Sequence, residues 1–173
     1  MIHAIPTDTC YGLACDIHDE EGYQAIYELK WRPDNKPLAM VVEDYDDIER
    51  FGIINEDQKE FLMDYPHPFT LITERIFHLP SYLDAHLYHK IAIRVADACI
   101  PYEDIRKKLS FPLFLTSANK SGEKECHTHK EVSAIFSTDH IIILGERSEW
   151  RPASDIFSFI GDTTEIIYHR HNH

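Results

Sequence analysis

The chain has 173 residues, of which 43% are apolar and 27% charged, a length and composition typical of a globular domain that buries its own core. The formal net charge is −13. Such a strong acidic balance argues against an extended basic face for nucleic acid, because phosphate contacts need clustered Lys and Arg. A local basic pocket for a small anionic ligand remains compatible with this charge.

The cysteines give no sign of a disulfide framework or of a C-x-x-C metal or redox motif. They lie at Cys10, Cys15, Cys99 and Cys126. The sequence also contains no apolar run long enough for a signal peptide or a membrane span. We therefore expect reduced thiols in a cytoplasmic protein that has no contact with a membrane.

Short apolar runs alternate with amphipathic stretches, without an internal repeat or a linker-like segment. We predict strands at Ile2–Ile5, Leu38–Val42, Phe69–Thr73, Ile91–Val95, Leu113–Thr116, His140–Leu144, Asp155–Phe159 and Glu165–Tyr168. We predict helices at Glu20–Lys30, Asp46–Phe51, Glu56–Met63, Tyr102–Leu109 and Lys130–Phe136. Strands interleaved with helices indicate a single α/β domain of the α+β type over residues 1–173, with helices packed against a twisted sheet.

The first strand leads into a polar stretch, "PTDTCYG". Thr7, Asp8 and Thr9 follow the strand, and Gly12 allows the backbone to turn closely. The stretch is neither a Walker loop nor a G-x-G-x-x-G motif, so it predicts no phosphate cradle of those two kinds.

A cationic loop follows the first predicted helix. Lys30, Arg32 and Lys36 fall within seven residues and only Asp34 opposes them. One interpretation is structural, because cations at a helix C-terminus complement the helix dipole. The other is that Lys30 and Arg32 both reach a phosphate or carboxylate, where Arg offers a fork of donors and Lys a point charge.

Two later strands end in polar groups. In "IAIRVAD", Arg94 lies near the end of a strand that looks buried, so its charge needs a structural partner or a ligand carboxylate. In "FLTSANKSG", Ser117 and Asn119 follow an apolar strand. Such strand ends often face the ligand crevice of an open α/β sheet, although a Ser/Thr or Asx turn that closes a loop would explain the same residues.

Several other features carry no predicted function. The segment 43–64 holds nine acidic and two basic residues and is typical of a solvated helical surface. Cys126, His127 and His129 lie close together, but no second pair at zinc spacing follows, so we predict no metal site. No G-x-S-x-G nucleophile motif occurs. The histidine-rich tail "YHRHNH" predicts an exposed, disordered end.

Taken together, the motifs resemble the YrdC family of threonylcarbamoyl-AMP synthases. The family pattern runs P-T-D/E-T-x-Y-G-L, K-x-R-P-x-x-K/N-P-L, P-G-P-x-T, V-R-V-P, S-A-N-x-S-G and P-S-x-x-x-D. This sequence has "PTDTCYGL", "KWRPDNKPL", "PHPFT", "IRVAD", "SANKSG" and "PASDIFS" in the same order, from about Ile5 to Ser158. Each motif alone is modest, whereas six in order are highly specific.

The resemblance implies a twisted mixed sheet flanked by helices, with a large concave, positively charged cavity. It also implies a nucleotidyltransferase that makes threonylcarbamoyl-AMP and pyrophosphate from L-threonine, bicarbonate and ATP, for modification of adenosine 37 in tRNA. Mg²⁺ would enter with ATP, bound mainly through its phosphates. The partners it suggests beyond these substrates are tRNA or tRNA-modification proteins.

The site residues implied by the resemblance come from matching motif positions. Lys30, Arg32, Ser117 and Asn119 match the family's nucleotide-binding tetrad, and Lys36 matches a further position on the nucleotide side. Catalysis would rest on positioning and on charge stabilisation by Lys30 and Arg32, without a protein nucleophile. The threonine would be held by residues at three matching positions, Thr7, Arg94 and Ser154, with Arg94 pairing the carboxylate.

The sequence departs from the family pattern at several points. His67 replaces the glycine of P-G-P, and Ala96 replaces the proline after "IRV". Asp155 and Ser158 stand where many relatives have Thr and Asp, and Arg170 lies only near the place of a late Arg-Pro-Gly. Two alternatives stay open, the first because of these departures and the second because of the expected concave basic surface. One is a paralogue that binds a nucleotide or another small anion without making threonylcarbamoyl-AMP. The other is an RNA-binding module, against which the net charge weighs.

Overall fold

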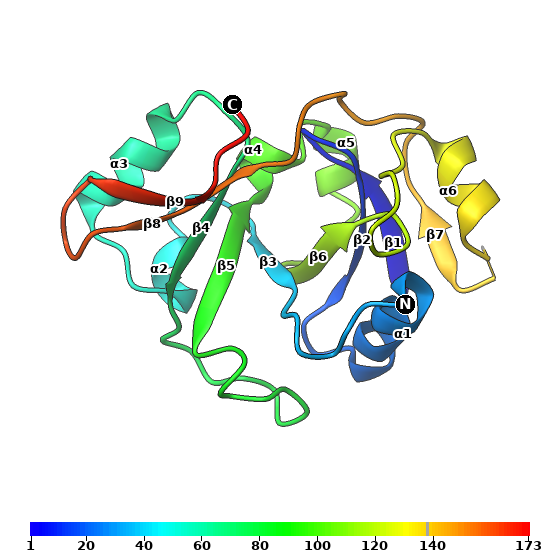
Figure 1. Cartoon of the computed structure of the whole chain (residues 1–173), viewed down its shortest axis with the longest axis horizontal. Helices are drawn as coiled ribbons and strands as arrows, with labels where there is room; N and C mark the ends of the chain where they lie inside the picture. The colour runs from blue at the N-terminus through cyan, green and yellow to red at the C-terminus, as the bar shows by residue number, and fades with distance from the viewer. Residues whose placement is uncertain (138) are drawn as a thin grey trace.

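The computed structural model describes residues 1–137 and 139–173, and within them nine strands form one mixed sheet (Figure 1). The strand order is β7-β1-β2-β6-β3-β5-β4-β8-β9. The strands are β1 Ile2–Pro6, β2 Tyr11–Asp16, β3 Ala39–Val42, β4 Phe69–Glu74, β5 Lys90–Val95, β6 Leu113–Ser117, β7 Ile141–Ile143, β8 Asp155–Phe159 and β9 Ile166–Arg170. The helices are α1 Glu20–Lys30, α2 Ile48–Phe51, α3 Glu56–Asp64, α4 Ala96–Cys99, α5 Glu103–Arg106 and α6 His129–Ile135.

The sheet mixes both kinds of strand pairing, which confirms the fold class that the sequence predicted. β1 pairs with β7, β3 with β5, and β4 with β8 in parallel. The other neighbouring strands pair antiparallel. Figure 1 shows α1 and α6 near the end of the sheet formed by β1 and β7, and α2 and α3 near β4, β8 and β9.

Helices pack on both faces of the sheet, but unequally. The larger core joins one face to α1, α2, α3 and α6 through Ile26, Ile48, Leu62 and Val132. A smaller core joins the opposite face to α4 and α5. Leu115 of β6 belongs to this smaller core and also lines a cavity, so the part of this face that α4 and α5 leave uncovered carries the candidate site.

The first helix has the bounds that the sequence predicted, and local chemistry explains both ends. Asp19 caps the N-terminus by accepting a 2.9 Å hydrogen bond from the Gly22 amide, and Glu20 occupies the first turn, where the helix dipole favours negative charge. The helix ends at Lys30 because Trp31 adopts a left-handed conformation with φ 54°.

The second strand, β2, is absent from the prediction, which treated this region as a turn containing Gly12. In the structure only residues 7–10 turn, and Gly12 lies inside β2 opposite Ser117 of β6. β2 runs between β1 and β6, and both its faces are buried. A strand buried on both faces lacks the alternation of apolar and polar residues that reveals a half-exposed strand.

The prediction of a disordered tail is wrong. Tyr168 to Arg170 continue β9, which pairs with β8. The Asn172 amide donates a 2.7 Å hydrogen bond to Oδ1 of the buried Asp155, and the His173 ring stacks on His67 with centroids 5.2 Å apart. The segment is ordered because a buried carboxylate from β8 holds it, a contact between positions too distant for a local pattern to show.

The helices are short. α5 covers only part of the predicted Tyr102–Leu109 helix, and the four-residue α4 was not predicted. α1 is the longest with 11 residues, and no helix in the described residues has the length and apolar character needed to cross a bilayer.

Candidate functional site

A cavity of about 300 Å³ opens on the sheet face that carries α4 and α5. Its walls come from seven strands and the loops beside them. The lining residues are Thr7, Thr9, Cys10, Gly12, Arg32, Pro37, Ala39, Thr70, Ala92, Arg94, Leu115, Thr116, Ser117, Glu125, Ala153, Ser154, Ile156 and Arg170. Chain segments from near both ends therefore meet in one space.

The cavity is positively charged although the chain is strongly acidic. Arg32, Arg94 and Arg170 line it, and Glu125 is the single carboxylate among its lining residues in the described part of the chain. Guanidinium groups recognise phosphates and carboxylates through paired N–H donors. Burial raises the pKa of the Cys10 thiol to about 11, so this group stays neutral and is not a thiolate nucleophile.

The first turn places two threonine side chains on the cavity wall. Thr7 Oγ1 donates a 2.6 Å hydrogen bond to the Cys10 carbonyl and accepts from the amides of Thr9 and Cys10 at 3.2 and 3.3 Å. These bonds fix the turn locally. Thr7 was predicted as a site residue and Thr9 was not.

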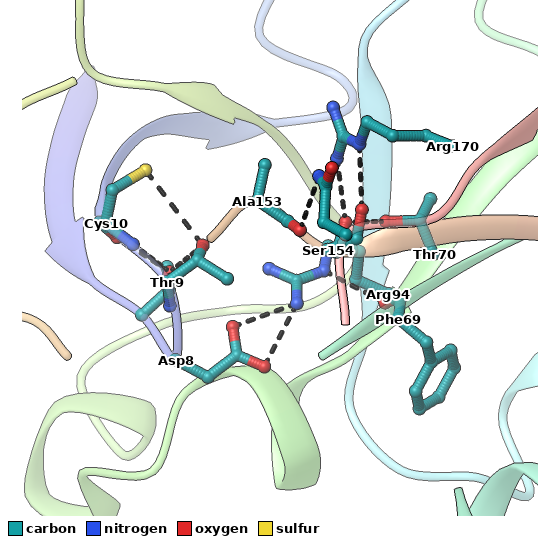
Figure 2. Close-up of polar contacts among 11 residues, drawn as sticks. Asp8, Thr9, Cys10, Phe69, Thr70, Arg94, Ala153, Ser154 and Arg170 are labelled. Atoms are coloured by element: carbon teal, nitrogen blue, oxygen red, sulfur yellow. Dashed lines mark hydrogen bonds and ion pairs between the residues drawn. The ribbon is translucent and has the colours of Figure 1, made fainter. Parts of the chain in front are cut away.

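Arg94 reaches the cavity from β5 with most of its donors already engaged (Figure 2). Its Nη2 donates to both carboxylate oxygens of Asp8, at 2.9 and 3.1 Å, and its Nε donates to the Phe69 carbonyl at 3.1 Å. Both charged side chains are buried. Burial raises the pKa of Asp8, and the positive charge of Arg94 opposes that rise. Asp8 is thus the structural partner of the buried Arg94. The sequence indicated that Arg94 needs a partner but not which residue provides it.

A second polar group joins β4 and β9 through Ser154, the residue before β8 (Figure 2). The Ser154 and Thr70 hydroxyls lie 2.7 Å apart in a hydrogen bond. Arg170 donates from Nε to the Ser154 carbonyl at 2.8 Å and from Nη2 to Ser154 Oγ at 3.1 Å. Ser154 was predicted, whereas Thr70 and Arg170 were not assigned to the site. In the sequence, both could have been identified: Thr70 ends the "PHPFT" motif, and Arg170 lies near the place of the family's late arginine.

Lys30 lies behind the cavity wall and does not line it. Its Nζ donates to the Ser117 carbonyl at 2.6 Å and to the main-chain and side-chain oxygens of Asn119 at 2.9 and 2.8 Å. Three acceptors use all three protons of an ammonium group. Burial and the nearby Arg32 charge lower the pKa of Lys30 to about 8. Lys30 therefore supports the loop after β6, and Ser117 at the end of that strand faces the cavity.

Of the two cations in the loop after α1, Arg32 faces the cavity and Lys36 faces the solvent. Arg32 lines the cavity and donates to the Lys36 and Pro37 carbonyls at 3.3 and 2.7 Å. The Lys36 side chain is exposed and is not part of the lining. Of the predicted site residues, the structure brings five into one cavity, places Lys30 and Asn119 behind its wall, and leaves Lys36 outside. The five that line the cavity are Thr7, Arg32, Arg94, Ser117 and Ser154.

Within the described ranges no group of three or more His, Cys, Asp or Glu side chains is arranged to hold a metal ion. Cys126 is buried, and the His127 ring stacks on Trp150 with centroids 3.9 Å apart. The Cys126–His129 segment therefore has a packing role in this structure.

Comparison with known proteins adds a family and a fold. The Sua5_yciO_yrdC family model, described as "Telomere recombination", matches residues 1–170. A threonylcarbamoyl-AMP synthase of Yersinia pestis is 30% identical over 146 residues, which are 82% of this chain and 76% of that protein. The structure of P. abyssi Sua5 complexed with L-threonine has 25% identity and a TM-score of 0.75, covering 91% of this chain and 47% of that one. E. coli YciO shows the same fold, with a TM-score of 0.78 and 19% identity. The match covers 98% of this chain and 82% of that one. The chain spans about half the length of the P. abyssi protein.

Proposed function

The chain belongs to the Sua5/YciO/YrdC family, and on that premise we propose that it is an L-threonylcarbamoyladenylate synthase. The proposed reaction joins L-threonine, bicarbonate and ATP to give threonylcarbamoyl-AMP and pyrophosphate. The observation that supports it best is the convergence of three arginines and several hydroxyl groups in one cavity of an otherwise acidic chain. Such a cavity suits two ligands that carry a carboxylate and a polyphosphate.

The threonine side of the proposed site consists of Arg94, Thr7 and Ser154. Arg94 would pair with the threonine carboxylate, because it is the buried cation with a fixed orientation. The hydroxyl groups of Thr7 and Ser154 lie on the same cavity and offer acceptors and donors to the amine and hydroxyl of the substrate.

The nucleotide side consists of Arg32, Arg170 and Ser117. Arg32 and Arg170 would neutralise phosphate oxygens, and Ser117 would add a hydroxyl at the end of β6. In this proposal Lys30 and Asn119 act by holding the loop that follows Ser117. Lys36 is exposed and would contribute only long-range charge to the nucleotide side.

The chemistry needs no protein nucleophile. The threonine amine and bicarbonate form a carbamate with loss of water, and a carbamate oxygen then attacks the α-phosphorus of ATP while pyrophosphate leaves. The residues around the cavity would contribute by orienting the two substrates and by stabilising charge on the phosphates. Mg²⁺ bound to ATP would meet one carboxylate on this wall, Glu125, which fits a metal held mainly by phosphates and water.

From the proposed reaction we expect a cytoplasmic role in the modification of tRNA adenosine 37. The product is an activated intermediate, so a tRNA or a tRNA-modification protein is the partner that would receive it. These partners are proposed from the reaction alone.

The test is pyrophosphate release from ATP and Mg²⁺ with bicarbonate, with and without L-threonine. Threonine-dependent release is expected for the wild type and should fall at least tenfold in Arg32→Ala, because one phosphate-facing cation is lost. Arg50→Ala is the matched control, since Arg50 is an exposed arginine on α2 that pairs with the neighbouring Asp47 and lies away from the cavity lining. ATP binding without threonine-dependent release would overturn the synthase in favour of a nucleotide-binding paralogue.

A further inference from the structure

Asp8 is a buried carboxylate with no role in the reaction proposed above. Its side chain accepts both hydrogen bonds from Arg94 Nη2, and its amide donates to the Cys99 carbonyl at 2.8 Å. Asp8 is not among the residues that line the main cavity. Asp8 instead lines a second, smaller cavity, which Arg94 lines as well.

The geometry of the Asp8–Arg94 pair leaves one edge of the guanidinium unused. An arginine and a carboxylate usually pair through two different nitrogens. Here both Asp8 oxygens share Nη2, and the Phe69 carbonyl takes Nε. Figure 2 shows the remaining terminal nitrogen of Arg94 without a dashed line.

The unused nitrogen, Nη1, is open to space. Among the described residues, His173 Nε2 is the single buried side-chain nitrogen or oxygen without a partner. Arg94 Nη1 also has no protein acceptor among these residues, yet it is not one of the buried unpartnered atoms. Nη1 is therefore accessible to solvent. Arg94 lines the main cavity and also the smaller cavity that Asp8 lines, and a substrate in the main cavity is the acceptor considered for Nη1.

We propose that Asp8 is a positioning residue for the amino-acid substrate: it fixes the Arg94 guanidinium with Nη1 turned toward the cavity, ready for a substrate carboxylate. This inference rests on the proposed function, because it takes the carboxylate of L-threonine as the ligand of Arg94.

The local charge permits a second carboxylate beside Asp8. Arg170 lines the same cavity and is close enough to Arg94 for their charges to interact. Among the residues that the structure describes, three arginines and one carboxylate, Glu125, line the cavity, so a net positive charge remains for the substrate even after Asp8 is counted against Arg94. Without Asp8, Arg94 and Arg170 would repel each other, and Arg94 would keep only its bond to the Phe69 carbonyl.

The test is titration calorimetry of L-threonine with the full chain as wild type, Asp8→Asn and Asp8→Glu. Asparagine keeps the shape but removes the charge and one acceptor, so Asp8→Asn should weaken threonine binding about tenfold or more. Asp8→Glu should recover part of the affinity, because it restores the carboxylate. Asp97→Asn, an exposed neighbour on α4, is the matched control and should bind as the wild type does.

Two further measurements separate positioning from a general structural role. The wild type should prefer L-threonine to L-threoninamide, which lacks the carboxylate, and Asp8→Asn should lose most of that preference. In an Arg94→Lys background, Asp8→Asn should lower the affinity for L-threonine little further, because both changes disrupt the same Asp8–Arg94 hydrogen bonds. Equal loss of L-threonine and L-threoninamide binding, or additive losses in the double variant, would overturn the positioning role. If Asp8→Asn does not fold, the same comparisons with Asp8→Glu decide, because a displaced Arg94 should still lower the preference for the carboxylate.

The outcomes also distinguish this inference from the function beneath it. Failure of the wild type to bind L-threonine at all would overturn the proposed function, and the role of Asp8 with it. Threonine binding by the wild type together with unchanged binding by Asp8→Asn would overturn the role of Asp8 alone.

Discussion

Lys30 and Asn119 are 89 positions apart, and Nζ of Lys30 donates hydrogen bonds to both oxygens of Asn119, at 2.9 and 2.8 Å. The Asn119 side chain continues the contact, because its Oδ1 also accepts from the Ser117 hydroxyl at 2.6 Å. Ser117 lines the cavity. A cation at the end of α1 thus sets the shape of the wall formed by the end of β6.

Replacing this cation should damage both stability and ligand binding. Lys30→Met keeps the length of the side chain but removes the ammonium that donates to three oxygens. The Asn119 carbonyl then loses its donor, whereas the Ser117 carbonyl keeps the Asn119 amide and Asn119 Oδ1 keeps the Ser117 hydroxyl. We expect the free energy of unfolding to fall by about 3 kcal/mol, measured by urea denaturation, since each unsatisfied buried acceptor costs about 1–3 kcal/mol. Nucleotide affinity should fall as well. Lys107→Met removes an exposed lysine and should change neither quantity; equal stability of the two variants would contradict the supporting role of Lys30.

The stability conferred by Lys30 should depend on pH in a defined direction. Its pKa is lowered from 10.5 to about 8 in the folded protein, so the folded state loses this proton before the unfolded state does. Between these values the unfolded state binds more protons, and the free energy of unfolding must rise with pH. The gain should reach at most about 3 kcal/mol across the window, by the usual value per pKa unit.

Urea denaturation of the wild type and Lys30→Met from about pH 7 to about pH 10 isolates this contribution, because other titrating groups cancel in the difference. The wild type should gain stability relative to the variant above about pH 8. A difference that stays flat with pH would show that Lys30 keeps its proton throughout the range.

Gly12 should not tolerate a side chain. A Cβ at this position would lie 2.4 Å from Leu115 Cδ1 and 3.2 Å from the Thr116 carbonyl oxygen, and the latter belongs to the backbone of β6. We expect Gly12→Ala to lower the free energy of unfolding by about 1–3 kcal/mol, as overpacking usually does, and to narrow the cavity that Gly12 lines.

Thermal unfolding and titration with ATP would measure both effects of Gly12→Ala. Gly122→Asn serves as the control, since a Cβ at Gly122 would meet no described atom within 4 Å and Asn tolerates positive φ. Wild-type stability in Gly12→Ala would mean that β2 and β6 can separate at little cost.

Asp155 should control the order of the C-terminal segment. Its carboxylate accepts from the Asn172 amide at 2.7 Å and from His173 Nδ1 at 3.2 Å, and also from the Tyr65 hydroxyl. Asp155→Asn removes the charge that holds these donors. Amide hydrogen exchange of residues 166–173 should accelerate about tenfold or more, because charged hydrogen bonds contribute about 1.5–3 kcal/mol each.

The matched control for Asp155→Asn is Asp162→Asn, an exposed position in the turn between β8 and β9. Its exchange pattern should resemble that of the wild type. Unchanged exchange in Asp155→Asn would show that strand pairing with β8 alone keeps this segment in place.

The sequence predicted the fold well where a local signal existed. The first helix carries a capping Asp19 and an acidic first turn, and its bounds agree with the structure. β8 was also predicted with its observed bounds. The turn at residues 7–10 was recognised, but β2 after it was not, because a strand covered on both faces shows no alternation.

The site was harder to predict, because motifs identify residues without showing what each side chain faces. Lys30 has the appearance of a phosphate ligand in sequence, and only the fold shows three oxygens around its Nζ. Arg94 was known to need a partner, and the choice of Asp8 depends on bringing the turn after β1 to the end of β5 in space. Arg170 could not be placed, because its position depends on the anchoring of β9 by Asp155.

The walls of the cavity draw on residues from Thr7 to Arg170, so almost the whole chain must be present before the cavity is complete. During synthesis on the ribosome, a nascent chain that has not yet exposed β9 would present two of the three arginines and an unpaired edge at β8. Full ligand affinity would then arise only after β9 has left the exit tunnel. Binding of substrate would accordingly report that β9 has taken its place beside β8.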